Sequence, residues 1–168
     1  MSAVKAKPEG YHTITPALAV TGGAEAIDFY KKGLAAEVLC QMMTPDGKRV
    51  AHAEIKIGDS IFFLYDEFPE MNPAGHPHLR LLAPASLSGS SCSFYVYVDD
   101  ADAAFKKAIE AGATVIRPVQ DQFYGDRNGM VADPFGHFWT FATHLREVSI
   151  EEIEKASNEN FSETAEAK

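Results

Sequence analysis

The chain has 168 residues, 46% of them hydrophobic, and a formal net charge of −9. A chain of this length folds as one compact domain or as two small modules with a shared core. The acidic balance argues against nucleic acid or an anionic membrane surface as a partner, whereas it suits solubility and cationic small molecules. No apolar run approaches the roughly twenty residues that span a bilayer, and the N-terminus lacks the apolar core of a signal peptide, so we expect a cytoplasmic protein. Cys40 and Cys92 form no CxxC motif and are expected to be buried thiols rather than a disulfide.

The first part of the chain combines short strand patterns with one helical pattern. Ala26, Ile27, Tyr30 and Leu34 recur at three- and four-residue spacings, which is typical of one face of a helix. Residues 48–57 alternate apolar and polar side chains, which indicates a strand with one buried face. In chain order we predict a mobile arm (1–11), a strand (14–20), a helix (24–34), a strand (37–43), a hairpin turn (44–47) and two further strands (48–57 and 60–65).

The second part of the chain begins with an irregular stretch. Residues 67–91 carry four prolines and a serine-rich run, which indicates an inter-module loop whose second half either lies over a cleft or is a disordered linker. Ser149 and Glu152 form a capping-box pattern, which predicts a short C-terminal helix. Between these stretches we predict a strand (92–99), a helix (100–111) capped by Asp99 or Asp100, a strand (114–119), a polar loop (121–128) and two strands (129–133 and 138–143).

The two halves of the chain repeat the same order of patterns. Gly58 and Gly136 each lie in a turn before an aromatic strand. The stretches 15–20 and 93–98 are separated along the chain by the same distance as these two glycines, and each stretch is followed by a helical pattern. The chain is therefore predicted to hold one module twice, at 12–66 and 92–145. The linker 67–91 joins the modules, and 146–168 follows them as a short helix and acidic tail.

Four local motifs carry a resemblance to a known family: AIDFYKK, HAEIKIGDS, FYGDRNG and DPFGHFW. Together with the duplication, they make the chain similar to the vicinal-oxygen-chelate superfamily of glyoxalases, bleomycin-resistance proteins and extradiol dioxygenases, and in particular to its PhnB-like subgroup. The resemblance implies an α+β fold in which two tandem βαβββ modules form curled mixed sheets around a cleft. The helices would cover the convex side of the sheets.

The resemblance also implies where a metal ion would be held. The metal enzymes of the family take His, Glu or Gln ligands from the first and last strand of each module. If the offset between the modules is constant, the corresponding positions here are Thr15 and Ser93 on the first strands, and Phe62 and Thr140 on the last strands. Hydroxyl groups are poor ligands for a divalent transition ion, and phenylalanine is none. We therefore expect neither a metal site nor a cofactor.

Other side chains are candidates for binding a ligand. His52 and Glu54 share the polar face of their strand, so they either bind a ligand or ion, act as a base and its orienting partner, or simply line a cleft. Phe62, Tyr95, Tyr97 and Phe138 have the side-chain parity of Thr15, Ser93 and Thr140, which predicts an aromatic cleft with a few hydroxyl groups. Such a cleft would bind a planar or partly apolar molecule by stacking, unless these rings only fill the cleft or pack a dimer.

The remaining polar candidates are open to two interpretations. Arg127 either forms a local ion pair with Asp126 or donates to an anionic ligand. His137 is predicted to be a turn residue, and His144 to lie near the cleft mouth or at the exposed strand end. His76 and His78 lie in the proline-rich loop without the spacing of a ligand pair.

These observations favour a metal-free protein that binds a drug, toxin or metabolite and sequesters it. Alternatively, the chain is a metal-dependent lyase or oxidoreductase with an atypical site at His52 and Glu54, joined by His144 or His137. A third possibility is a purely structural or interaction role. Family members commonly dimerise, and open sheets leave strand edges to be covered, so we expect a homodimer.

Overall fold

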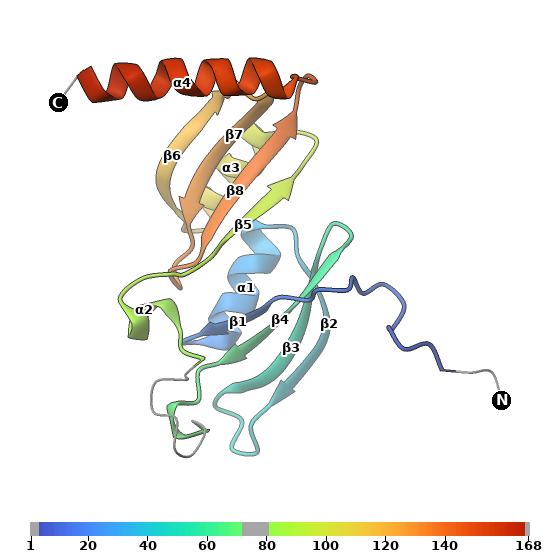
Figure 1. Cartoon of the computed structure of the whole chain (residues 1–168). Helices are drawn as coiled ribbons and strands as arrows, with labels where there is room; N and C mark the ends of the chain where they lie inside the picture. Colours follow the sequence, from blue (N-terminus) through green and yellow to red (C-terminus); the bar gives the residue numbers. More distant parts are fainter. Residues whose placement is uncertain (1–3, 72–80, 167–168) are drawn as a thin grey trace.

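The structure is a computed structural model that describes residues 4–71 and 81–166, with residues 160–166 described by backbone alone. It holds two four-stranded sheets, one above the other in Figure 1. The first module consists of β1 (Ala17–Val20), α1 (Gly23–Gly33), β2 (Glu37–Met43), β3 (Val50–Ile57) and β4 (Ser60–Asp66). The second consists of β5 (Ser93–Tyr97), α3 (Ala101–Glu110), β6 (Thr114–Asp121), β7 (Asp126–Ala132) and β8 (Phe138–His144). The short η1 (Pro69–Met71) and α2 (Pro84–Leu87) lie between the modules, and α4 (Ile150–Glu166) follows them.

The two sheets have the same topology. Their strand orders are β1-β4-β3-β2 and β5-β8-β7-β6. In each sheet the first strand runs parallel to the last, and the other pairs are antiparallel. The predicted α+β fold with two βαβββ modules is therefore confirmed, and the sheets are not closed into a barrel.

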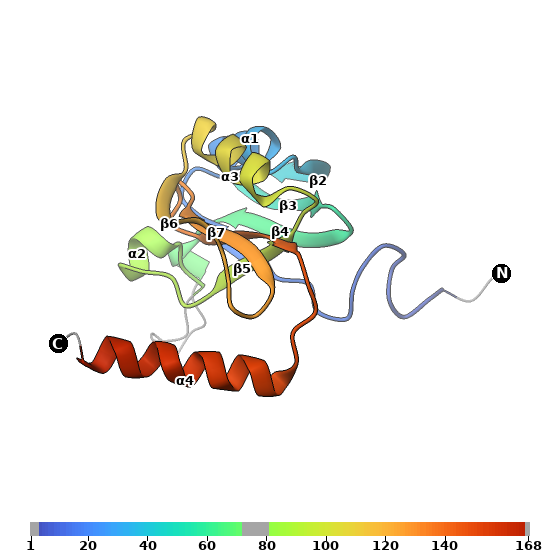
Figure 2. The ribbon, with the colours of Figure 1, turned by 90° about the horizontal axis from the view of Figure 1, so that it is seen from above.

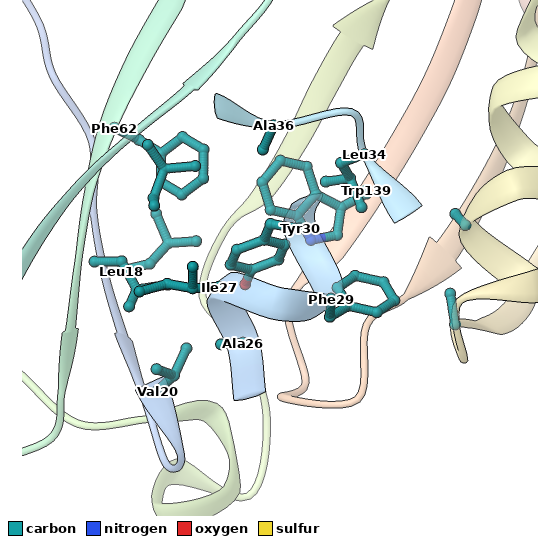
Figure 3. Close-up of a cluster of buried hydrophobic side chains, with 14 of the residues drawn as sticks. Leu18, Val20, Ala26, Ile27, Phe29, Tyr30, Leu34, Ala36, Phe62 and Trp139 are labelled. Carbon is teal, nitrogen blue, oxygen red and sulfur yellow. The ribbon is translucent and has the colours of Figure 1, made fainter. Parts of the chain in front are cut away.

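One apolar core serves both modules. Figure 2 shows α1 and α3 side by side on the same side of the molecule, and the two helices are in contact. Tyr30 lies at the centre of this core, with ring centroids 5.8 Å from Phe62 of β4 and 5.5 Å from Trp139 of β8 (Figure 3). All three side chains are buried. Burying aromatic area from both modules makes each module depend on the other for its core.

The β7–β8 turn forms polar links between the modules. The Tyr30 hydroxyl donates to Asp133 Oδ2 at 2.9 Å, and His137 Nε2 lies 3.1 Å from the carbonyl oxygen of Ala19 in β1. Trp139 Nε1 donates to the same Asp133 oxygen at 2.9 Å. Because these groups are buried, their hydrogen bonds fix how the second module sits on the first.

The duplication has two offsets rather than one. Ala17 pairs with Phe63 in the first module, whereas Tyr95, the counterpart of Ala17, pairs with Thr140 in the second. The offset between the modules is therefore shorter by one residue for the last strands than for the first strands. Three residues separate each helix from the next strand, but α1 has 11 residues and α3 has 10, so the first module has one more residue between the start of its helix and the start of the next strand. The prediction that Phe62 and Thr140 occupy equivalent positions is wrong, because it assumed a constant offset.

The corrected offset explains how both helices begin. Asp66 Oδ1 accepts from the backbone N–H groups of Gly22 and Gly23, at 2.8 and 2.9 Å, at the start of α1. Thr143, the counterpart of Asp66 at the shorter offset, accepts from the N–H of Ala101 at 2.9 Å, at the start of α3. The last strand of each module thus satisfies free N–H groups of its own helix.

Several local predictions can be compared with the structure. Asp100 caps α3, and Ser149 and Glu152 form the predicted capping box. Cys40 and Cys92 are free, but Cys40 is half-buried and Cys92 is exposed, so the prediction of buried thiols is wrong. Helix α4 continues to Glu166, through the stretch expected to be a tail.

Two further predictions concern the histidines of the proline-rich loop and the lack of a segment that spans a membrane. His76 and His78 lie outside the described residues. Within residues 4–71 and 81–166, no helix has the length and apolar composition needed to cross a bilayer.

Candidate functional site

A groove of about 680 Å³ lies between the two modules. One wall is β5 with the residue after it, from Phe94 to Val98, and the other is the β3–β4 turn from Ile57 to Phe62. Buried Trp139 also lines the groove. The remaining lining residues are His12, Ile14, Pro16, Leu34 and Ala35. The volume is that of a site for a small molecule, and most of the lining is aromatic or aliphatic.

The groove exists because the modules are not equivalent where they meet. Ser60 aligns with His137 at the offset of the last strands, so the small turn with Gly58 and Asp59 stands where the second module has its longer Asp133–His137 turn. At the offset of the helices, Tyr30 aligns with Ala108. The second module's turn reaches α1 and β1 of the first module, through Tyr30 and Ala19. In the other direction, the small Gly58–Asp59 turn of the first module and the small side chain of Ala108 in α3 leave space between the modules.

Two tyrosines connect the groove to a polar network on the sheet face opposite α3. Tyr95 and Tyr97 line the groove, and their hydroxyls donate to Asp126 Oδ2 at 3.1 and 3.0 Å. His144 Nδ1 lies 2.8 Å from Asp126 Oδ1. Burial acts to raise the pKa of Asp126, but the hydrogen bonds from His144, Tyr97 and Tyr95 outweigh it and hold the pKa below its usual range. The buried carboxylate is therefore ionised and keeps both tyrosines in place.

Asn128 extends this network beneath the tyrosine rings. Its Nδ2 donates to the hydroxyls of Tyr95 and Tyr124 at 2.7 and 2.8 Å, and its Oδ1 accepts from Arg117 at 2.7 Å. Burial, with Tyr124 and Asp126 close by, raises the pKa of Tyr95 well above its ordinary value. Tyr95 therefore stays protonated and presents a neutral aromatic ring to the groove.

The first sheet carries a smaller polar cluster on its own open face. His52 Nε2 lies 3.6 Å from Glu54 Oε1, and the Tyr11 hydroxyl donates to Glu54 Oε2 at 2.6 Å. Glu54 raises the pKa of Tyr11 through this hydrogen bond. The His52 ring contacts Phe63 at 5.0 Å between centroids. These side chains form a shallow acid–base cluster, and none of them lines the groove.

The structure separates the residues that the sequence grouped as one cleft. Tyr95 and Tyr97 line the groove, and so does Phe62, but Phe62 reaches it from the helix-facing core and not from the open face. Thr140 is buried in β8, where it pairs with Tyr95 of the neighbouring strand β5. Ser93 and Phe138 pair at the start of the same two strands and do not line the groove. Thr15 lies between the lining residues Ile14 and Pro16.

Arg127 lies away from the groove. It donates to Asp102 at 2.6 and 2.8 Å and to Asp121 at 2.8 Å, on the helix side of β7. Asp126 has other partners, so the Asp126–Arg127 ion pair, one of the two interpretations of Arg127, is wrong, and Arg127 is not among the residues that line this groove. Adjacent residues of a strand point to opposite faces, which is why the two charges do not meet.

Sequence reasoning missed Asp126, Asn128 and Asp133 as organising residues. A signal existed for the first two, because polar residues two apart on one strand share a face. The partners of Asp126 and Asp133 come from distant strands, and nothing local in the sequence indicated them.

The residues at the family's metal positions do not fit a transition ion. With the corrected offset, the counterpart of Thr140 is Phe63, and Thr15 corresponds to Ser93. These four side chains provide no imidazole and no carboxylate. Across the described part of the chain, no three His, Cys, Asp or Glu side chains converge in a way that could hold a metal ion. Catalytic steps through a metal at these positions therefore have no ligand set to support them.

Comparison with known proteins identifies the family. The family model described as glyoxalase/bleomycin resistance protein/dioxygenase superfamily matches residues 12–141. An uncharacterised protein of Mycobacterium bovis is 41% identical over 143 residues, which is 85% of this chain and 90% of the relative.

Solved structures have the same fold. TioX from Micromonospora sp. ML1 is 27% identical, with a TM-score of 0.59 over 80% of this chain and 99% of its own. The PhnB protein from Bacillus cereus, 19% identical with a TM-score of 0.56 over 79% of this chain and 99% of its own, supports the fold alone. The chain belongs to the glyoxalase/bleomycin resistance protein/dioxygenase superfamily.

Proposed function

We propose that this protein binds a partly apolar small molecule in the inter-module groove without a metal ion, and thereby sequesters it. The observation that carries the proposal is the groove of about 680 Å³ lined by Tyr95, Tyr97, Phe62 and Trp139. Aromatic walls supply binding free energy through buried area and stacking. A drug, toxin or metabolite with a planar part fits this lining, and the net charge of −9 favours a neutral or cationic one over an anion.

The tyrosine hydroxyls make the groove selective. Asp126 holds the hydroxyls of Tyr95 and Tyr97, so these rings do not need to be ordered when a ligand binds. Preorganised aromatic side chains reduce the entropy cost of binding. Tyr97 keeps acceptor capacity on its oxygen, which is the kind of group that discriminates ligands by hydrogen bonding.

Binding can be measured with the chain's single tryptophan, because Trp139 lines the groove. We expect a panel of planar heteroaromatic compounds to include members that change Trp139 fluorescence and raise the melting temperature. Tyr95→Ala should weaken such a compound by ~1–3 kcal/mol, the scale for losing a buried aromatic contact. Phe68→Ala is the matched control, since Phe68 packs under Arg49 away from the groove. EDTA should leave binding unchanged.

The competing candidate is an enzyme whose ion or base chemistry lies at the first sheet's polar cluster. His52, Glu54 and Tyr11 support it because they are already hydrogen-bonded or close to one another. In that case chelation abolishes activity, and Glu54→Gln costs far more than Tyr95→Ala. A ligand that is lost on chelation and insensitive to Tyr95→Ala would reject sequestration in the groove.

We expect the protein to act as a homodimer in the cytoplasm, with neither nucleic acid nor membrane as a partner. The open sheet faces support this, because Met42, Ile116 and Tyr97 are between 50% and 64% exposed there, and large exposed apolar side chains favour association. Light scattering at micromolar concentration measures the mass directly. A monomer mass would count against the dimer but not against the groove.

A further inference from the structure

We infer that the groove accepts an extended peptide segment, which adds to β5 as a new edge strand. This inference goes beyond the proposed small-molecule binding, because it concerns the same groove but a different class of ligand. The peptide would be four or five residues long, since β5 spans five residues at about 3.3 Å each. Addition of a strand to an exposed sheet edge is a common mode of peptide binding.

The outer edge of β5 has no partner strand in the part of the chain that the structure describes. Among the described strands, β5 pairs only with β8. The N–H of Val98 donates to the carbonyl oxygen of Ala142 in β8 at 2.8 Å. Backbone groups of successive strand residues point to opposite edges, so the N–H and C=O groups of Tyr97 and Tyr95 point away from β8. These are the groups with which an added strand would pair.

The groove runs along this edge. Its lining includes five consecutive residues, Phe94 to Val98, of which the first four belong to β5 and Val98 follows it. Alternate residues point to opposite faces of a sheet, so a groove on one face would contact only every second residue. Contact with all five means that the groove exposes the strand's edge, including its backbone.

The first module shows how such an edge is closed. The carbonyl oxygen of Ala19 in β1 lies 3.1 Å from His137 Nε2 of the other module. At the offset of the first strands, the corresponding residue of β5 is Tyr97, and at the offset of the last strands the counterpart of His137 is Ser60. Ser60 donates to Asp59 at 2.9 Å instead of crossing the groove. An edge that one module covers is therefore left open in the other.

The second wall limits what can pair with this edge. The β3–β4 turn, from Ile57 to Phe62, lies across the groove from β5. A groove with walls on both sides favours a single extended chain over the whole sheet of a second copy, because that sheet would have to pass the turn. The occupant is therefore a strand-like segment with its own amide groups.

The net charge of the protein and the residues that line the groove indicate which peptide side chains would fit. Among the described residues that line the groove, Asp59 is the only acidic or basic side chain other than His12, and the chain as a whole carries −9. A lysine or arginine in the peptide complements this charge. The apolar floor at Phe62 and Trp139 requires apolar side chains at alternate positions, because these point to one face of the added strand.

The probe for this inference is a capped five-residue peptide that alternates valine and lysine. We expect it to quench or shift Trp139 fluorescence, and to protect the amide hydrogens of Tyr95 and Tyr97 from exchange. The same peptide with N-methylated amides keeps its side chains but cannot donate to the strand, so its affinity should fall at least tenfold. Tyr97→Pro removes the outward N–H at a position where an edge strand tolerates proline, and should lower affinity to a similar degree. Tyr97→Phe, which keeps that N–H, is the matched control.

The outcomes separate this inference from the proposed function. If planar compounds bind while the peptide does not, or if N-methylation and Tyr97→Pro leave peptide affinity unchanged, strand addition is overturned and small-molecule binding stands. If neither planar compounds nor peptide perturb Trp139, both proposals fail. If Tyr97→Pro turns a dimer into a monomer, a second copy occupies the edge, and peptide addition is likewise overturned.

Discussion

The hydroxyl of Tyr30 donates a 2.9 Å hydrogen bond to Oδ2 of Asp133, and this bond joins α1 of the first module to the β7–β8 turn of the second. Asp133 also accepts from Trp139 Nε1 and from the backbone N–H groups of Phe135 and His137. A buried carboxylate with donors from both modules couples their stability, because losing one donor leaves the carboxylate with one hydrogen bond fewer in a buried site. Burial and the neighbouring Asp133 raise the pKa of Tyr30 well above its ordinary value, so the donor keeps its proton.

Tyr30→Phe should lower the free energy of unfolding by ~1.5–3 kcal/mol, the scale for a hydrogen bond to a charged group. The ring remains, so the aromatic packing on Phe62 and Trp139 is kept. Urea denaturation measures the difference. Tyr65→Phe is the control, because the structure gives the Tyr65 side chain no hydrogen bond among the described residues. Equal effects of the two substitutions would contradict a special role for the Tyr30–Asp133 bond.

Asp66 and Thr143, which accept from backbone N–H groups at the starts of α1 and α3, should contribute unequally to the free energy of unfolding. Asp66 accepts from Gly22, Gly23 and Val50, at 2.8, 2.9 and 2.7 Å, so Asp66→Ala leaves three N–H groups without an acceptor. Thr143→Val leaves a single N–H group, that of Ala101 at the start of α3, without its acceptor, and it also removes the 3.0 Å hydrogen bond from the Thr143 hydroxyl to the carbonyl oxygen of Val98. We expect losses of ~3 kcal/mol or more for Asp66→Ala and ~1 kcal/mol for Thr143→Val. Thermal denaturation of both variants gives the order, and a larger loss for Thr143→Val would refute it.

The fold could be predicted from the sequence because its signals are local and repeated. Turn glycines such as Gly58 and Gly136, and the spacing of apolar residues in 24–34, indicated the order of elements and the existence of two modules. The internal duplication then indicated the topology. These signals depend on backbone conformation and periodicity, which neighbouring residues largely determine.

The candidate site was predicted less well because it depends on register and on distant contacts. The first module has one more residue than the second between the start of its helix and the start of the next strand, and the offset of the last strands differs by one residue from that of the first strands. A shift of one residue turns a strand's side chains to the other face. Phe62 was therefore assigned to the wrong face. The partners of Asp126, such as His144 and Tyr95, lie 18 and 31 residues away, so local patterns could not reveal them.

The Asp126–His144 pair should make stability depend on pH. The hydrogen bond to Asp126, with Glu147 nearby, raises the pKa of His144 above its ordinary value of about 6.5. A raised pKa in the folded state means that the stabilisation is fully present below about pH 6.5 and is lost as the pH rises through the folded-state pKa. The difference in urea midpoint between the wild type and His144→Gln should therefore shrink between about pH 6 and pH 9. A difference that grows with pH would contradict the assignment.

The contrast between Ser60 and His137 gives the sharpest test of how the groove arises. Ser60 corresponds to His137, and Tyr97 corresponds to Ala19. Ser60→His therefore places an imidazole in the first module that would meet Tyr97, in the same way that His137 meets Ala19. We expect this substitution to fill part of the groove and to weaken planar compounds at least tenfold by Trp139 fluorescence, with stability kept or raised. The reverse change, His137→Ser, removes a buried contact to Ala19 and should cost ~1–2 kcal/mol of unfolding free energy. Ser86→His in α2 is the control for adding an imidazole at an exposed serine that does not line the groove. If Ser60→His leaves ligand affinity unchanged while Ser86→His behaves like the wild type, the β3–β4 turn does not bound the binding site, and the ligand must lie elsewhere on β5.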